Sequence, residues 1–439
     1  MGQSRKVRWK MSSESSGKPK VKILGSGREV GRAAIGVEYK GRTVLLDYGV
    51  NFDENEQPIY PLHVRPKDVE ALVLTHSHLD HIGAAPALFI SVKPRLLATP
   101  LTLDVTRLLL YDMIKLNGPN LIFDNSTVDD MLGVAESVDY ERSVELGGFT
   151  LTLMSSGHIP GSASALVDVN GTRVLYTSDM NNIETKLMSP HRLAGVKADV
   201  VIIESTYSTV THPERSVTER EFYESVEDVV KRGGTVLVPA FSVARGQEIM
   251  CLLEERGFGW PVWIDGMIRS ITDLYLAHSS FIRDPRLLAR ASEEQNLVKG
   301  WGDRKKALKK PGVIISSAGM LKGGPALYYY SRIVQNDKDA VFLVSYQAPG
   351  TPGRQALEEG VFFDGERKLP VKARLQLFDF SSHADWRGVV QTLRSISGVR
   401  KVILVHGEPQ GQMELASKIR DELSLEVMIP QNGDDIELG

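Results

Sequence analysis

Five apolar segments of this chain each end in a side chain that can bind a metal ion or exchange a proton, and this pattern limits the possible folds more than any other feature. The segments are rich in Val, Ile and Leu, as buried strands are, and they end at Asp47, His76, Asp179, Glu204 and His406. In open α/β folds the carboxyl ends of strands line the ligand crevice. One acidic residue after a strand is usually a turn or a helix cap, but five such residues favour a shared site.

The most specific motif is HSHLDH, which starts at His76. His76 and His78 are two residues apart, so both rings point the same way from an extended backbone. Asp80 and His81 follow at the expected start of a helix over IGAAPALFI. Burying these four ligand-type side chains without a shared cation would be costly, which argues against an ordinary polar loop. Because Cys251 is the chain's one cysteine, imidazole and carboxylate ligands favour a catalytic metal site over a structural one.

Strand-like and helix-like segments alternate along the chain, which predicts an α/β fold in several parts. Residues 1–19 are polar and Ser-rich, as is typical of a flexible tail. A first block of strands covers residues 20–204. Regular strand–helix alternation over 205–365 predicts a separate parallel layer, and a last block covers 366–439.

Composition excludes several classes of protein. The chain carries 52 Lys and Arg against 55 Asp and Glu, so its net charge is −3 and nucleic-acid binding would need a local basic patch. No apolar run approaches the ~18 residues of a membrane span. The basic start MGQSRKVRWK lacks the apolar core of a secretory signal. We therefore expect a cytoplasmic protein without membrane contact.

The HSHLDH run resembles the signature of the metallo-β-lactamase superfamily. The other marks of that signature follow in order, with Asp47 before the run, His158 in SGHIPGSA and Asp179 in YTSDM. This resemblance implies an αββα sandwich, formed here by residues 20–204 as its first part and 366–439 as its C-terminal part.

The block at 205–365 resembles the β-CASP subfamily, which implies an inserted parallel α/β β-CASP domain. Its three marks are Glu204 in ESTY, His383 in FSSHAD and His406 in LVHGE, and PAFSVARGQE, SSAGMLKGGPA and SYQAPGTPGR resemble further segments. The chain looks similar to archaeal nucleases of the cleavage-and-polyadenylation-specificity-factor type, although nothing ahead of Val21 resembles their KH domains. These relatives imply a ribonuclease of RNA processing or decay.

The resemblance implies a centre of two metal ions. The first ion would be held by His76, His78, His158 and Asp179, and the second by Asp80, His81, His406 and again Asp179. Asp47 would act behind the ligands by accepting a ring N–H or orienting water. The many imidazoles lean towards two Zn²⁺, with Mn²⁺ as the alternative.

The implied catalytic residues are Asp80, Glu204 and His383. Two metal ions can stabilise the attacking and leaving oxygens of a phosphodiester. His383 is the candidate proton donor to the leaving 3′-oxygen, and Glu204 could orient it and raise its pKa. The alternative is that His383 only hydrogen-bonds the scissile phosphate. The products would carry 5′-phosphate and 3′-hydroxyl ends, from endonuclease and also 5′-to-3′ exonuclease cleavage.

Single-stranded RNA is the expected partner, gripped by its backbone. The predicted RNA-binding residues form two sets. In SSAGM, Ser316, Ser317 and Gly319 follow a strand and could present backbone N–H groups to a phosphate, whereas Arg245, Lys322 and Arg354 follow Gly-containing turns and could pair with it. Ordinary turn chemistry is the alternative for them. A basic run from Arg304 to Lys310 could follow phosphates in the cleft between the two domains or could be a solvated helix face.

Other functions stay open at this stage. The main alternative is a non-catalytic or weakly active scaffold of an RNA 3′-end processing complex, although such relatives typically lose ligands. Hydrolysis of a small ester is disfavoured by the inserted block, and DNA processing is disfavoured by His406 at the third mark. A homodimer and an RNA-processing or decay complex are further expectations. The remaining histidines show no ligand spacing and are expected at the surface or in packing, and they are His63, His191, His212 and His278.

Overall fold

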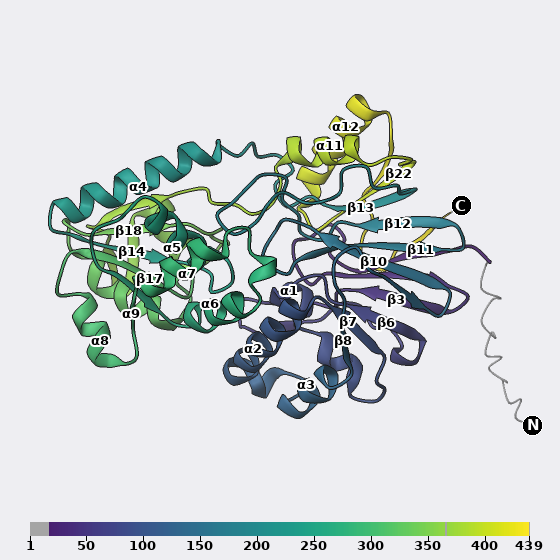
Figure 1. The fold of residues 1–439 in the computed structure, drawn as a ribbon, viewed down its shortest axis with the longest axis horizontal. Helices are drawn as coiled ribbons and strands as arrows, with labels where there is room; N and C mark the ends of the chain where they lie inside the picture. Colours follow the sequence, from purple (N-terminus) through teal and green to yellow (C-terminus); the bar gives the residue numbers. More distant parts are fainter. Residues whose placement is uncertain (1–16, 365–366, 439) are drawn as a thin grey trace, which may run out of the picture.

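The computed structural model describes residues 17–364 and 367–438. The expected flexible tail therefore falls mostly on residues 1–16, outside the described part of the chain. Two domains lie side by side along the longest axis, one built on two facing sheets and the other on a third sheet (Figure 1).

The first sheet of the two-sheet domain has seven strands. Their order is β24 (Asp435–Glu437), β1 (Lys20–Gly25), β2 (Ala34–Tyr39), β3 (Arg42–Leu46), β6 (Val69–Val73), β7 (Arg95–Ala98) and β8 (Ala135–Ser137). The helices of this half are α1 (Leu79–Ile82), α2 (Pro100–Asn117) and α3 (Asn125–Leu132), with short 3₁₀ turns η1 (Pro66–Asp68), η2 (Ala85–Phe89) and η3 (Gly118–Asn120). Between β3 and β6, the chain also forms a small antiparallel hairpin of β4 (Asn51–Phe52) and β5 (Pro58–Ile59).

The second sheet also has seven strands and shares a buried core with the first. Their order is β23 (Glu426–Met428), β22 (Lys401–Val405), β13 (Val200–Glu204), β12 (Thr172–Tyr176), β11 (Ala163–Val169), β10 (Phe149–Ser155) and β9 (Ser143–Leu146). Helices α11 (Trp386–Ser395) and α12 (Pro409–Leu423) cover its outer face, and α1 to α3 lie outside the first sheet (Figure 1). Helices on both outer sides of two packed sheets confirm the predicted αββα sandwich.

The third sheet is parallel throughout. Its order is β16 (Asn296–Leu297), β15 (Val262–Asp265), β17 (Gly312–Ser316), β14 (Thr235–Pro239), β18 (Ala340–Leu343) and β21 (Arg374–Leu377). Around it lie α4 (Arg215–Lys231), α5 (Arg245–Glu255), α6 (Ile268–Ala277), η4 (Ser279–Phe281), α7 (Pro285–Glu293), α8 (Trp301–Ala307), α9 (Gly324–Ile333), α10 (Pro352–Glu359) and the hairpin β19 (Val361–Asp364) and β20 (Arg367–Pro370). The predicted parallel α/β insertion is thus confirmed as a fold.

The burial pattern of the strands agrees with their pairing direction. Every residue of β13, β14 and β17 is buried, as expected of strands covered on both faces. β10 instead alternates buried and half-buried residues and pairs antiparallel with β9 and β11.

Two details differ from the sequence pattern. The helix expected over IGAAPALFI is divided into α1 and η2, because Pro86 cannot donate a backbone hydrogen bond and its ring would clash with the preceding turn. The third sheet includes β21, which lies after the expected boundary at residue 365. The exact domain boundaries stay predictions.

The two domains pack directly on each other. Leu101 and Val105 of α2 belong to the same hydrophobic cluster as the helices over the third sheet, and α2 contacts α6. The carboxyl ends of β13 and β22 therefore face a junction between domains. Within the described residues, no helix is both long enough and apolar enough to cross a membrane.

Candidate metal centre

The ligand-type residues are placed at strand ends by unusual backbone turns. Asp47 follows β3 with φ 60°, Ser178 follows β12 with φ 53°, and His406 follows β22 with φ 52°. The left-handed region is uncommon for residues other than glycine and costs roughly 1–3 kcal/mol at each such residue. These turns stop the strands and place Asp47, Asp179 and His406 close together.

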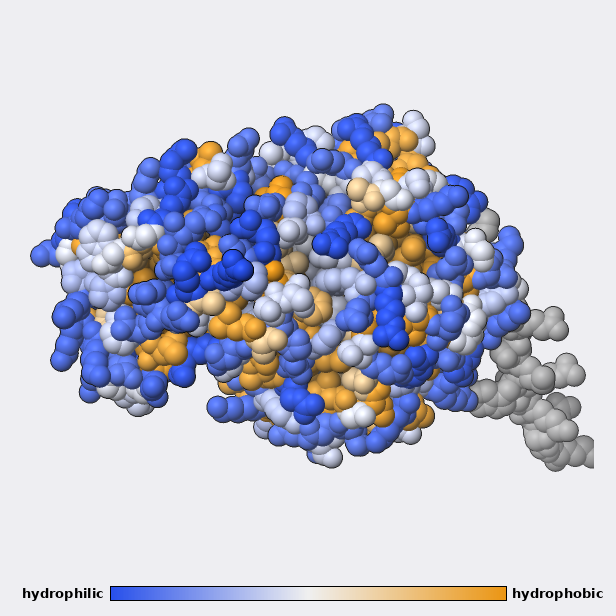
Figure 2. All heavy atoms as spheres, in the orientation of Figure 1, coloured by the Kyte–Doolittle hydropathy of each residue, from blue (hydrophilic) through white to orange (hydrophobic). Residues whose placement is uncertain are grey.

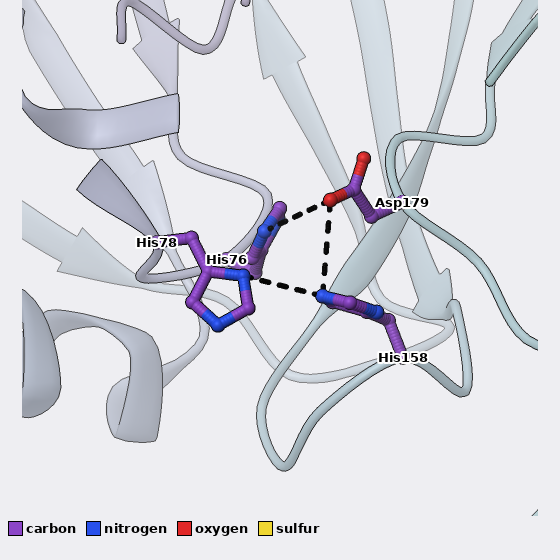
Figure 3. Close-up of side chains that lie close together, drawn as sticks. All are labelled: His76, His78, His158 and Asp179. Carbon is purple, nitrogen blue, oxygen red and sulfur yellow. Dashed lines mark hydrogen bonds and ion pairs between the residues drawn. The ribbon is translucent and has the colours of Figure 1, made fainter. Parts of the chain in front are cut away.

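The first ligand group comprises His76, His78, His158 and Asp179 (Figure 3). One ligand atom from each lies within 4.8 Å of the others. The Oδ2 atom of Asp179 lies 3.6 Å from His76 Nε2 and 3.7 Å from His158 Nε2. His158 Nε2 in turn lies 3.3 Å from His78 Nδ1. The four side chains surround a point that one cation could occupy.

The second group comprises Asp80, His81 and His406, also within 4.8 Å of one another. His406 Nε2 lies 3.3 Å from Asp80 Oδ2. The other oxygen of Asp179, Oδ1, lies 3.5 Å from His81 Nε2 and 3.6 Å from His406 Nδ1. Asp179 therefore directs one carboxylate oxygen to each group, which is the arrangement of a bridging ligand.

Unpaired buried atoms indicate that these groups fit metal ions. His76 Nε2, His81 Nε2 and Asp179 Oδ1 are buried and make no hydrogen bond. Leaving such atoms without a partner costs about 1–3 kcal/mol each, more for a charged group. Cations shared between imidazoles and carboxylates would satisfy all three.

The protonation states of the first group suit metal binding. Burial lowers the pKa of His76 and His158 well below the ordinary value and that of His78 to about 4, so these rings are neutral and can ligate. Burial also acts to raise the pKa of Asp179, but His406 and His81 outweigh it, so its pKa is low and the carboxylate stays charged.

Asp47 lies behind the ligands rather than among them. Its Oδ2 atom is 2.7 Å from His81 Nδ1 and also accepts hydrogen bonds from Thr75 Oγ1 and Tyr176. Its Oδ1 atom accepts from the Thr75 backbone N–H. Because Nδ1 of His81 is engaged, Nε2 remains for a metal ion, as in carboxylate–histidine–metal arrangements.

Glu204 and His383 form a pair beside the first group. His383 Nδ1 lies 2.9 Å from Glu204 Oε2, and its ring centre lies 4.5 Å from that of His158. Glu204 is held by Thr206 Oγ1 and the Met180 backbone N–H, each at 2.6 Å. Burial acts to lower the pKa of His383, but Glu204 and Asp179 outweigh it and raise the pKa to about 9.

A cavity of about 240 Å³ opens beside this pair, between the two domains. Its lining includes His158 and His383 from one domain and Arg245, Tyr346 and Arg354 from the other. Burial and the nearby Arg215 lower the pKa of Arg245 to about 10, so it stays charged at neutral pH. The cavity thus offers a half-buried cation next to the metal-type groups.

The structure separates the predicted RNA contacts. Arg245 and Arg354 line the cavity, although Arg354 also pairs with Glu358 at 2.6 Å. Ser316 and Gly319 are buried. Within the described residues, the cavity lining does not include the other four members of the set, which are Ser316, Ser317, Gly319 and Lys322. The Nζ atom of Lys322 instead lies 3.7 Å from Glu56 Oε1. Contact with RNA stays a prediction for all six.

His212, expected only at the surface or in packing, belongs to the surroundings of His383. Its Nδ1 atom lies 2.6 Å from Asp379 Oδ2, and its backbone N–H donates to Asp385 at 3.2 Å. Asp379 and Asp385 flank the segment that carries His383. The sequence held one indication of this role, because His212 lies in the same loop as the mark at Glu204.

Comparison with known families gives three matches along the chain. The metallo-beta-lactamase superfamily matches residues 29–240, the Beta-Casp domain matches 246–356, and the Zn-dependent metallo-hydrolase RNA specificity domain matches 368–430. Together they cover both domains of the fold.

Curated relatives match over nearly the whole chain. RNase aCSPSF2 of Saccharolobus solfataricus is 45% identical over 95% of this chain and 85% of its own length. Probable RNase MJ4 of Methanocaldococcus jannaschii is 32% identical over 94% of this chain and 99% of its own length. Transcription termination factor FttA of Pyrococcus horikoshii is 31% identical over 94% of this chain and 70% of its own length. Among solved structures, a protein of unknown function from Enterococcus faecalis shares the fold, with a TM-score of 0.58 and 14% identity over 96% of this chain and all of the other.

Proposed function

Because this chain belongs to the metallo-beta-lactamase superfamily and carries its Beta-Casp domain, we propose that it is a metal-dependent ribonuclease that hydrolyses RNA phosphodiester bonds. The observation that supports this best is Asp179, whose two carboxylate oxygens face two separate ligand groups. Full ligand groups disfavour the scaffold alternative, since a scaffold has no need of them. The relatives named as RNases support RNA as the substrate.

Two divalent ions would be held by the two ligand groups, with Asp179 shared between them. Imidazole-rich ligation favours Zn²⁺ over Mn²⁺. When bound, such ions would polarise the phosphate and lower the pKa of bound water towards about 7. Asp47 would fix the orientation of the His81 ring through the 2.7 Å contact with Nδ1.

His383 would protonate the leaving 3′-oxygen. Its Nδ1 is engaged by Glu204, so Nε2 is the atom left to carry the proton to substrate. A raised pKa keeps the ring protonated at neutral pH, as a general acid requires. Arg245, a charged group in the adjacent cavity, would bind a phosphate of the same strand.

His212 would act as a positioning residue for His383. Replacing His212 by Ala removes the bond to Asp379 and loosens the segment before His383, so kcat should fall by about 10-fold or more. Metal content and KM should stay close to wild type. Asn at this position can donate from Nδ2 near the former Nδ1 and should restore most of kcat.

The matched control is His278→Ala, because His278 makes a similar 2.6 Å pair with Asp104 away from the metal centre. Steady-state kinetics with metal analysis would decide the question. Equal kcat losses for His212→Asn and His212→Ala, or a change in metal content, would contradict positioning through Asp379.

The direct test of function is digestion of one RNA labelled separately at each end, together with metal analysis of the protein. We expect about two metal ions per chain and products with 5′-phosphate and 3′-hydroxyl ends. Internal fragments from a 5′-blocked RNA would establish endonuclease cleavage, and stepwise release from an open 5′ end would establish exonuclease cleavage. A metal-loaded chain that cuts neither RNA would refute the proposal. Assembly as a homodimer or within an RNA-processing complex stays a prediction.

A further inference from the structure

Helix α8 carries an exposed aromatic and basic surface on the inserted domain, on the side away from the two-sheet domain (Figure 1). We call Trp301, Arg304, Lys305, Tyr328 and Arg332 the α8 surface. Trp301 is 62% exposed, the largest exposed fraction of any aromatic residue described. Hydrophilic and neutral side chains predominate over α8 on the visible face (Figure 2).

Positive charge is concentrated here although the whole chain is slightly acidic. Between residues 299 and 310 a single acidic residue, Asp303, faces six basic ones: Lys299, Arg304, Lys305, Lys306, Lys309 and Lys310. Lys306 pairs with Asp303 at 3.0 Å. Lys305, Lys309 and Lys310 are exposed and have no ion-pair partner within the described residues. Such unpaired cations attract a polyanion.

The Trp301 ring is held in place by neighbouring side chains and still remains largely exposed. Arg304 lies over it at 4.9 Å from the ring centre, and Arg304 is itself fixed by the buried Asp265 at 2.7 Å. Tyr328 contacts the ring edge-on at 5.2 Å, and Arg332 lies over Tyr328 at 3.8 Å. A ring that is fixed and exposed can stack on an unpaired base with little loss of side-chain entropy.

A short segment links this surface to the cavity at the metal centre. Helix α9, which carries Tyr328, begins at Gly324, separated by three residues from the SSAGM loop (316–320), and Ala326 N–H donates to the Ser317 carbonyl. At the other end of the loop, the Gly319 carbonyl accepts a hydrogen bond from Gln347, which lines the cavity. The SSAGM loop therefore contacts both the cavity lining, through Gln347, and the helix that carries Tyr328.

We infer that the α8 surface is a second binding site for single-stranded RNA, where Trp301 stacks on an unpaired base while Lys305 and Arg332 bind phosphates. The identity of the ligand rests on the proposed ribonuclease function. The site adds affinity for RNA that extends several nucleotides beyond the cavity, and it takes no part in bond cleavage.

The test compares a fluorescently labelled unstructured RNA of about 30 nucleotides with one of about 5, since only the longer can occupy both sites. Binding is measured by stopped-flow anisotropy before cleavage. Trp301→Ala should weaken binding of the long RNA roughly 10-fold, the loss of one base stack of ~1.4 kcal/mol. Affinity for the short RNA and its cleavage rate should not change, and Trp301→Phe should retain most of the affinity.

Three further readouts guard against a merely structural effect. Phe363→Ala removes another exposed ring of the same domain, 49% exposed, and should leave both affinities unchanged. Lys305→Ala should lower the slope of log affinity against log salt by about 0.7. The chain has five Trp residues, and the quenching caused by long RNA should be smaller in Trp301→Phe than in wild type.

Equal affinity of wild type and Trp301→Ala for the long RNA would overturn the inference while leaving the ribonuclease proposal intact. The inference would also be overturned if polyglutamate displaced the long RNA equally well from wild type and from Trp301→Ala. That result would identify an acidic protein segment as the partner. If a metal-loaded chain binds long RNA through Trp301 but cuts none, the ribonuclease proposal fails and the second site stands.

Discussion

Replacing Asp179 by Ala is expected to abolish both metal binding and RNA cleavage. One carboxylate serves both ligand groups, with Oδ2 facing His76 and His158 and Oδ1 facing His81 and His406. Its removal leaves the first group with imidazoles alone and takes one of the two carboxylates from the second, so both groups lose the charge that holds a dication. Losing several kcal/mol of metal-dependent stabilisation corresponds to a rate at least about 1000-fold lower.

The measurement is metal content by elemental analysis, alongside single-turnover cleavage of a labelled RNA. Asp168→Ala is the matched control, because Asp168 is a half-exposed carboxylate paired with Arg173 at 3.4 Å on the same domain. The control should keep both ions and full activity. Retention of two ions in Asp179→Ala would show that the carboxylate does not bridge, and full activity would remove it from the centre altogether.

The candidate ligand residues can be proposed from the sequence because their signals are local. A strand followed by Asp or His is visible in a few residues, and the spacing of HSHLDH alone places two rings on one side. The parallel insertion was equally visible, since fully buried strands such as β14 and β17 appear as short apolar runs.

Contacts between distant segments were not accessible in this way. The sequence predicts packing or the surface for His212, yet its Nδ1 atom lies 2.6 Å from Asp379 Oδ2, on a segment 167 residues away in the chain. Residues 371–380 fall in the predicted last block (366–439), yet β21 within them pairs with β18 in the third sheet. Periodicity indicates that a strand forms and which face is buried, but the choice of neighbouring strand is decided by tertiary packing.

The SSAGM loop illustrates a further limit. Its small residues suggested backbone groups presented to a phosphate, but Ser316 is fully buried, and an added Cβ at Gly319 would lie 3.0 Å from Phe241 N. Close packing against neighbouring segments is therefore a second reason for the small residues at this loop, and their contact with RNA stays a prediction. Sequence alone does not separate a glycine needed for packing from one needed for ligand approach.

Replacing His383 by Gln is expected to leave both metal ions in place and to slow cleavage by about 100- to 10,000-fold, the usual contribution of a general acid. Gln can still donate a hydrogen bond to Glu204, which is held independently by Thr206 and Met180, so the surrounding structure should persist. It cannot supply a proton to the leaving oxygen. Single-turnover rates on a metal-loaded protein would measure the loss free of product release.

The pH dependence of the cleavage rate should also show whether His383 donates a proton. A general acid must be protonated, so the wild-type rate should fall as pH rises through the pKa of His383, which Glu204 and Asp179 raise to about 9. Bound dications would repel the imidazolium and move this limb to lower pH. The limb should be missing in His383→Gln, whereas His191→Gln, which alters a histidine bonded to Thr392, should retain it.

An RNA with sulfur in place of the scissile 3′-oxygen separates the two possible roles of His383. A thiolate is a good leaving group without protonation, so a variant that lacks only the proton donor should cut this substrate at close to the wild-type rate. A variant that has lost a phosphate contact should remain slow on both substrates, because the phosphate is unchanged. Rescue by the sulfur substrate would establish His383 as the proton donor, and an undiminished defect would leave it as a phosphate-binding residue.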